Sequence, residues 1–182
     1  MKNHSSLSKA ALLMAAATSG MAATSQAAAV YNESINGDLS NSSVSPTVLT
    51  SGTDPINGTL NFLADPSDYF ILSGLPAGGT AKFSFNHLKA DNQLSVRFLF
   101  SDPTGGNLYD TGFNPADNSS GSTGALAIPA SGQIRISVEN GGTYEANPNT
   151  SWNVSTVEVI PEPSGAALVA LGALLALKRR RD

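Results

Sequence analysis

Three stretches in the middle of the chain alternate between hydrophobic and polar residues. Hydrophobic side chains occupy every second position in 81–86, 94–100 and 134–139, and most positions between them are polar. Because side chains in a β-strand point alternately to the two faces of a sheet, this period of two predicts half-buried strands. We also expect strands at 57–63, 68–72 and 152–159. In the last of these the hydrophobic phase changes between Val154 and Val157, which a bulge would explain.

Turn-forming residues separate these stretches. Pro, Gly, Asp and Asn gather at 64–67, 76–79, 102–107 and 139–142. No stretch between the two termini has a helical period. Short strands separated by such turns predict an all-β fold, a single β-sandwich or jelly-roll-like domain over 57–159. A Ser- and Asn-rich segment, 28–56, precedes this domain. Residues 32–53 and 114–124 have a composition typical of flexible loops.

The N-terminus has the three parts of an export signal. Lys2 and Lys9 flank a short polar start, an apolar run follows over 10–17, and small residues come next. We predict a signal peptide over 1–27, cleaved after Ala27, with Ala29 as the alternative position. The rest of the chain is therefore expected outside the cytoplasm.

The C-terminus, 160–182, also has three parts. Pro161, Glu162 and Pro163 precede thirteen apolar or small residues at 165–177, and a basic group follows, consisting of Lys178, Arg179, Arg180 and Arg181. A helix of thirteen residues spans about 20 Å, whereas the bilayer core is about 30 Å thick, so it is a marginal transmembrane helix. The cations match a cytoplasmic flank, and the prolines keep Glu162 on extended chain. These features predict a sorting signal, and an ordinary tail anchor is the alternative.

This arrangement of Pro161-Glu162-Pro163, hydrophobic run and terminal arginines resembles the PEP-CTERM sorting signal of Gram-negative bacteria. The resemblance implies an exosortase, an integral-membrane processing enzyme, as partner. It also implies cleavage near the motif, so that the precursor is tethered to the inner membrane only transiently. The mature protein is then expected at the cell surface or in the extracellular matrix.

The middle of the chain resembles the bacterial pre-peptidase C-terminal domain. The similarity lies in Asp68-Tyr69-Phe70 followed by Pro76-Ala77-Gly78, and in a later strand that leads into Asp102-Pro103-Thr104-Gly105. It implies a small jelly-roll-like sandwich. Some members of that family bind calcium or extracellular polymers, but no specific ligand follows for this chain.

Removing the two signals changes the charge of the protein. Four basic and twelve acidic residues remain, so the exported domain carries about −8 instead of the −4 of the whole chain. Nucleic acid is not expected as a partner because phosphate binding requires clustered cations. Divalent cations or a hydrated polysaccharide fit this charge better. The chain has no cysteine, which excludes disulfides and thiol chemistry.

The exported part has few residues suited to catalysis. His87 is its one histidine, and no nucleophile elbow surrounds its serines. A glycosidase needs two carboxylates that converge across a cleft. Twelve acids make such a pair possible, but most of them lie beside Pro, Gly or Asn in expected turns. We therefore predict that the protein is not an enzyme.

A calcium site is the candidate metal centre. Asp65 and Asp68 lie three residues apart, and Asp102 and Asp110 flank a Gly-rich turn that contains Asn107. Calcium takes about six to eight oxygen ligands, which loops at one end of a sandwich can supply. The alternative is that these aspartates only stabilise turns.

Taken together, the sequence predicts a secreted, exosortase-processed protein of the cell surface or of a biofilm and polysaccharide matrix. Its expected role is non-catalytic, structural or adhesive. A calcium- or polysaccharide-binding module is the alternative, and a secreted hydrolase is the third candidate. The expected partners are the export machinery, the exosortase and extracellular polysaccharide.

Overall fold

The computed structural model describes residues 28–61, 63–89, 95–113, 118–141 and 149–162. The predicted signal peptide with Ala27 lies outside these residues. So do Pro163, the hydrophobic run 165–177 and the basic residues 178–181. Within the described ranges, no helix is long and apolar enough to cross a membrane.

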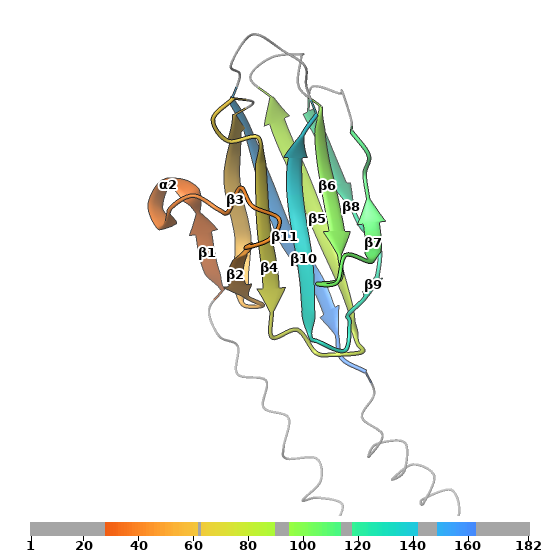
Figure 1. Cartoon of the computed structure of the whole chain (residues 1–182). Helices are drawn as coiled ribbons and strands as arrows, with labels where there is room; N and C mark the ends of the chain where they lie inside the picture. Colours follow the sequence, from red (N-terminus) through yellow and green to blue (C-terminus); the bar gives the residue numbers. More distant parts are fainter. Residues whose placement is uncertain (1–27, 62, 90–94, 114–117, 142–148, 163–182) are drawn as a thin grey trace, which may run out of the picture.

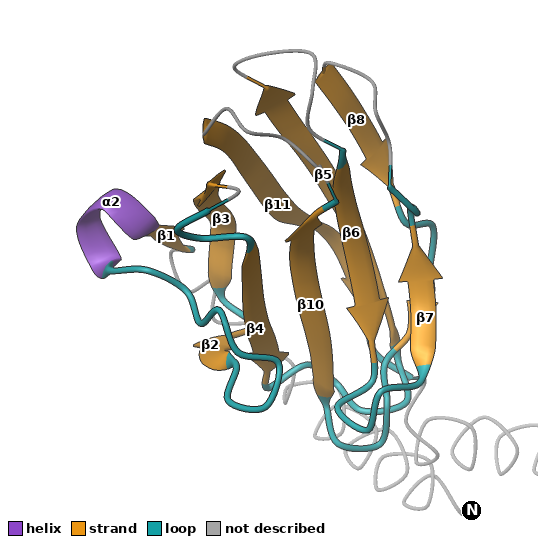
Figure 2. Ribbon diagram, turned by 45° about the horizontal axis from the view of Figure 1, so that its top comes forward, coloured by secondary structure: helices purple, strands orange, loops and turns teal. Residues whose placement is uncertain are grey.

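Two β-sheets pack face to face (Figures 1 and 2), which confirms the predicted all-β sandwich. The first sheet has the order β1-β3-β11-β5-β8, with β9 also beside β5. The second has the order β2-β4-β10-β6-β7. The strands of the first sheet are β1 Ala29–Asn32, β3 Thr53–Asn61, β5 Thr80–Lys89, β8 Asn118–Ser122, β9 Leu126–Ala127 and β11 Asn149–Ile160. Those of the second are β2 Thr47–Thr50, β4 Ser67–Ser73, β6 Val96–Ser101, β7 Asn107–Asp110 and β10 Gln133–Asn140.

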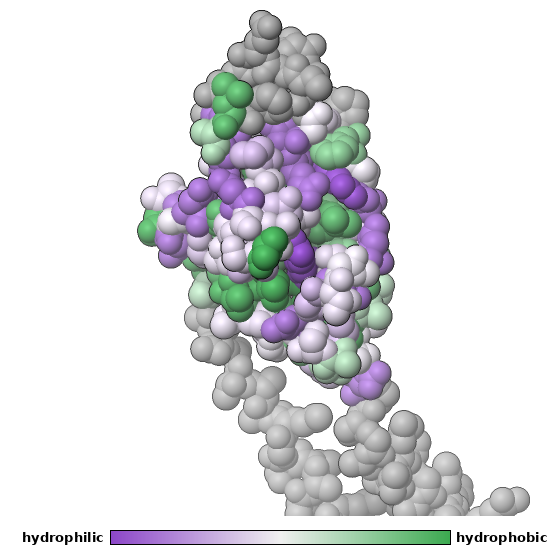
Figure 3. Space-filling model, viewed as in Figure 1, coloured by the Kyte–Doolittle hydropathy of each residue, from purple (hydrophilic) through white to green (hydrophobic). Residues whose placement is uncertain are grey.

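The core lies between the sheets and is rich in aromatic rings. The inward positions of β5 and β6 carry phenylalanines that meet across the interface. The ring centroids of Phe83 and Phe100 are 5.2 Å apart, and those of Phe85 and Phe98 are 4.8 Å apart. The alternation along these strands therefore fills the core from both sides. On the molecular face drawn in Figure 3, hydrophilic and hydrophobic residues are interspersed.

The six strands expected from the sequence are present, and the phase change in β11 is a bulge. The register of β11 against β5 shifts between Thr156 and Glu158. The structure also has elements that the sequence did not predict. β1, β2 and the four-residue helix α2 (Glu33–Asn36) lie within 28–56, and β8 lies within 114–124. All three strands lie at sheet edges and none of their described side chains is fully buried, so backbone pairing with a neighbour places them more than side-chain burial does.

The segment that follows β1 covers one open edge of the sandwich. β1 pairs parallel with β3 in the first sheet, whereas β2 pairs parallel with β4 in the second. Residues 33–46, which we call the crossing segment, therefore run from one sheet to the other and include α2 (Figure 1). Leu39, which is 2 % exposed, anchors the segment in the core. The candidate site lies beneath it.

Candidate metal centre

Four carboxylates meet where the crossing segment covers the edge of the sandwich. Glu33, Asp38, Asp65 and Asp68 each offer an oxygen, and these four oxygens lie within 4.8 Å of one another. Glu33 begins α2, Asp38 follows it, Asp65 lies in the turn before β4, and Asp68 is on β4. We call these four residues the acidic cluster. It is the one group of potential metal ligands found among the described residues.

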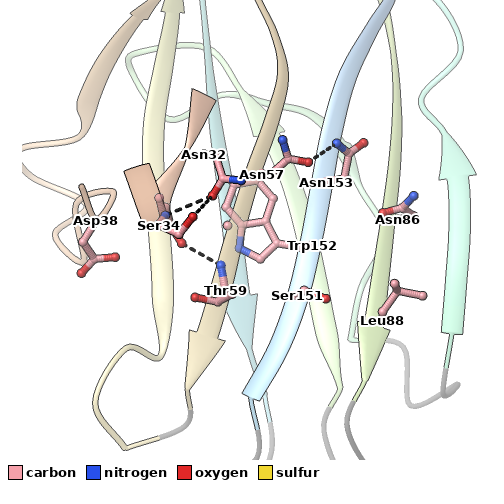
Figure 4. A pocket seen from close by; sticks show the side chains of 12 residues that line it. Asn32, Ser34, Asp38, Asn57, Thr59, Asn86, Leu88, Ser151, Trp152 and Asn153 are labelled. Carbon is pink, nitrogen blue, oxygen red and sulfur yellow. Dashed lines mark hydrogen bonds between the residues drawn. The ribbon is translucent and has the colours of Figure 1, made fainter. Parts of the chain in front are cut away.

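Backbone amides hold Glu33 in place. The amide of Thr59 on β3 donates to Glu33 Oε2 at 2.7 Å, and the amide of Leu39 donates to Oε1 at 3.2 Å. Asn32 caps α2 by accepting a hydrogen bond from the Ser34 amide (Figure 4). The absence of a side chain at Gly58 makes room, because a Cβ there would lie 2.8 Å from Glu33 Oε2. Neighbouring strands thus fix the carboxylate in the cluster.

Asp68 is the most deeply buried member of the cluster. Its side chain is 0 % exposed, and the indole Nε1 of Trp152 donates to its Oδ2 at 2.8 Å. Among the described residues, no N–H or O–H group donates a hydrogen bond to its other oxygen, Oδ1, or to the buried Oδ1 of Asp65. Two buried carboxylate oxygens without a donor are costly unless a proton or a cation satisfies them.

The raised pKa values of the cluster also indicate uncompensated negative charge. Burial, followed by the charges of Glu33 and Asp65, raises the pKa of Asp68 to about 9. Burial, followed by Asp38 and Glu33, raises the pKa of Asp65 to about 6. Burial also raises the pKa of Glu33. The charges that shift these pKa values are all acidic, so the cluster has an excess of negative charge.

Protons and a cation are alternative ways to relieve this repulsion. The carboxyl groups of Glu33 and Asp68 are close enough to hydrogen bond, but one of them must be protonated to donate. A bound cation would replace that proton and use the free oxygens directly. Cation binding and protonation of the cluster therefore compete.

The donor set fits calcium. It consists of carboxylate oxygens without nitrogen or sulfur, and hard cations such as Ca²⁺ prefer such ligands. Oxygens on opposite sides of a Ca²⁺ ion lie about 4.6–5.2 Å apart, against about 4.0–4.2 Å for Mg²⁺. The four oxygens of the cluster lie within 4.8 Å of one another, no farther apart than opposite oxygens around one Ca²⁺ ion, and calcium also accepts irregular geometry.

The structure brings together two of the four aspartates suggested by the sequence. Asp65 and Asp68 belong to the acidic cluster. Asp102 and Asp110 lie at the β6–β7 hairpin of the second sheet. There, Asp102 accepts from the amides of Thr104 and Gly106, and Asp110 pairs with Arg97 at 2.6 Å. Each has a local partner, which corresponds to the turn-stabilising alternative.

Glu33 and Asp38 were missed because their segment has the composition of a loop. The sequence did contain one signal for them, because Glu33 and Asp38 are the two acidic residues in the otherwise uncharged stretch 28–53. His87 is the histidine that the sequence offered for catalysis. Its side chain is 1 % exposed and packs near Phe98 in the core. It therefore lies inside the sandwich and is not presented to solvent.

The described part of the predicted sorting motif follows the last strand. Pro161 and Glu162 are exposed and come directly after β11. The carboxyl group of Glu162 lies beside Gly78, in the turn between β4 and β5, where a Cβ would be 2.6 Å from Glu162 Cδ. The motif thus begins against the end of the folded domain.

Comparisons with known proteins identify no family for this chain. No family model matches the chain, and neither does any curated protein. One similar solved structure is Aeromonas hydrophila PliG, a periplasmic lysozyme inhibitor of g-type lysozyme. The two chains are 16 % identical over 60 % of this chain and 96 % of PliG, with a TM-score of 0.35. The sandwich fold is therefore assigned from the strand pairing of this chain alone.

Proposed function

We propose that this protein is an exported, non-catalytic component of the bacterial surface or extracellular matrix whose β-sandwich binds calcium at the acidic cluster. One observation carries the calcium proposal. Asp68 is fully buried, has an unpartnered oxygen, and lies among three further carboxylates. A divalent cation would neutralise this charge and join the crossing segment to β4. Calcium then acts as a structural clamp across the edge of the sandwich.

The expected affinity is that of an extracellular site. Extracellular calcium modules have dissociation constants of about 10⁻⁴–10⁻³ M. At a calcium concentration 100 times the dissociation constant, the folded state gains about 2.7 kcal/mol. For a domain of this size, that gain corresponds to an increase in Tm of roughly 10 °C.

The test is thermal unfolding with and without calcium. We expect Tm to rise with CaCl2 in the millimolar range, to fall back with EDTA, and to respond less to MgCl2. Asp68→Asn keeps the shape but removes a ligand charge, so it should abolish most of the rise. The matched control is Asp102→Asn, which changes an aspartate outside the cluster and should leave the calcium response intact. A Tm that is insensitive to 10 mM calcium would eliminate the site.

Delivery to the surface is the second part of the proposal. It is supported by the resemblance of Pro161-Glu162-Pro163 and the following residues to a PEP-CTERM signal, and by the export signal at the other end. The partners proposed are the export machinery, an exosortase-type enzyme and the polysaccharide matrix. Pro161 and Glu162 are exposed, so an enzyme can reach the beginning of the motif.

Intact-mass analysis of the secreted protein tests this delivery. We expect the wild type to lose mass corresponding to a C-terminal fragment removed near the motif. Glu162→Ala should leave the precursor uncut, while Glu158→Gln, a change at an exposed acid within β11, should be processed normally. A secreted wild-type protein with its C-terminus intact would refute the sorting proposal.

A further inference from the structure

A row of asparagines crosses the outer face of the first sheet. Strand register aligns Asn32 with Asn57, Asn57 with Asn153, and Asn153 with Asn86. The four side chains line a groove of about 610 Å³ and lie on neighbouring strands (Figure 4). We call this set the asparagine row. It runs perpendicular to the strands, from β1 to β5.

Much of the hydrogen-bonding capacity of the row remains unused. Asn153 Nδ2 donates to Asn57 Oδ1 at 2.7 Å, and Asn57 Nδ2 donates to the Tyr31 carbonyl at 3.2 Å. Each of these amides therefore keeps a second N–H. Within the part of the chain that the structure describes, the exposed Asn86 amide has no hydrogen bond. The groove thus offers both donors and acceptors to a ligand.

A second line of groove residues, which runs parallel to the asparagine row, is also uncharged. Ser151 aligns with Thr59 on one side and with Leu88 on the other. Leu88 is 59 % exposed and provides an apolar contact beside the hydroxyls. The described residues that line the groove include no cation, and their acids, Glu33 and Asp38, belong to the acidic cluster at the α2 end. An anionic ligand would find no counter-charge here.

We propose that this groove binds a neutral polysaccharide chain running along the asparagine row. Neighbouring strands are about 4.8 Å apart, which is close to the length of one hexose unit in an extended chain. Successive sugars would therefore each meet an amide on a successive strand. Paired amide donors and acceptors suit the hydroxyl groups of sugars, and Leu88 can contact a C–H face of the ring.

The chemistry of the groove favours this occupant over a protein or a nucleic acid. A protein-binding hot spot usually has exposed aromatic or arginine side chains, and the one aromatic ring in the lining, Trp152, is buried. The acidic exported domain disfavours nucleic acid. Without an exposed ring for stacking, each site should bind weakly, and a polymer should bind better than a monosaccharide because it engages several molecules at once.

Retention on insoluble polysaccharides tests the proposal with the purified protein. The probes are cellulose, a β-1,3-glucan, cross-linked dextran, amylose resin and mannan, with alginate beads as the anionic comparison. All buffers contain the same saturating calcium concentration, because Glu33 and Asp38 of the acidic cluster also line the α2 end of the groove. We expect retention on at least one neutral polymer and none on alginate. Retention on none of the neutral polymers would overturn the proposal.

Variants identify the binding face. Asn86→Asp and Asn153→Asp change little in size but add a charge, and each should weaken binding at least tenfold. Asn107→Asp makes the same change on β7 of the second sheet and should bind as the wild type does. Asn153→Asp also removes the amide that donates to Asn57 and thus changes an internal contact. Asn86→Asp changes no such contact, and its Tm verifies its folding. Unchanged polysaccharide binding of Asn86→Asp would overturn the proposal. A wild-type protein that is dimeric while Asn86→Asp is monomeric would also overturn it, because the groove would then bind a second copy of the chain.

Discussion

At the scale of single residues, Asp68 and Trp152 connect the two sheets beside the acidic cluster. Asp68 comes from β4 and Trp152 from β11, and the indole donates to the carboxylate at 2.8 Å. Trp152 also stacks on Phe70, with ring centroids 5.9 Å apart. Such a hydrogen bond contributes about 0.5–1.5 kcal/mol while the carboxyl group of Asp68 is protonated and about 1.5–3 kcal/mol when it is charged. Asp68 therefore has a structural partner on one oxygen and a free position for a ligand on the other.

The pKa values of the cluster predict how stability depends on pH. The pKa is raised to about 6 for Asp65 and to about 9 for Asp68, so the folded state binds protons more tightly than the unfolded state does. The resulting stabilisation is fully present below about pH 4, the ordinary carboxyl range, and is lost as pH rises through 6 and 9. In EDTA, we expect the free energy of unfolding to fall between pH 5 and pH 9.

Urea unfolding, followed by the fluorescence of Trp152, measures this dependence. Saturating calcium replaces the protons, so the stabilisation by calcium should increase with pH. Asp68→Asn should flatten the profile recorded in EDTA. If stability in EDTA instead increased from pH 5 to pH 9, these carboxylates would not control it.

At the scale of elements, α2 and β3 form the wall that holds Glu33. The Thr59 amide reaches Glu33 because Gly58, the preceding residue, leaves space for both the Glu33 carboxylate and the Trp152 ring. The parallel pairing of β1 with β3 brings α2 to this position. The short helix is therefore placed by its contacts with β1 and β3, since four residues are too few for a stable helix on their own.

Gly58→Ala should disturb this wall. The new Cβ would meet the Trp152 ring and lie 2.8 Å from Glu33 Oε2, so a neighbour must move. We expect a loss of about 1–3 kcal/mol in the free energy of unfolding, together with weaker calcium binding because Glu33 is displaced. Gly52→Ala is the matched control, because a Cβ at Gly52 meets nothing within 4 Å. Equal stability of the two variants would show that α2 does not pack on β3 as described.

The sequence predicted the elements whose side chains alternate, such as β5, β6 and β10, because burial on one face leaves a pattern. It did not predict β1, β2 and β8, whose positions depend on pairing with a distant strand. The same reason limited the candidate site. Asp65 and Asp68 are neighbours in sequence, whereas Glu33 joins them only through the parallel β1–β3 pair. Asp102 and Asp110 had the expected residue types but found partners within their own hairpin.

At the scale of the whole molecule, residues 28–160 are strongly acidic, because four basic and twelve acidic residues give them a charge of about −8. Part of this charge is concentrated in the acidic cluster, where Asp65 and Asp68 have raised pKa values. The outer face of the first sheet carries uncharged amides and hydroxyls in its groove. The molecule thus places a charged edge, suited to a cation, directly beside a row of uncharged amides, suited to a sugar polymer, and Glu33 and Asp38 lie at the border between them.

The most direct test of calcium binding uses Tb³⁺, a luminescent substitute for Ca²⁺ that accepts energy from a nearby indole. Trp152 is the single tryptophan of the chain, and its Nε1 bonds to Asp68, so an ion in the cluster would lie close to it. We predict Tb³⁺ emission on excitation of Trp152, with saturation at one ion per chain. Excess Ca²⁺ should quench this emission by displacement, and Asp68→Asn should greatly reduce it. Absence of sensitised emission from the folded wild type, or undiminished emission from Asp68→Asn, would contradict a calcium site at Glu33, Asp38, Asp65 and Asp68.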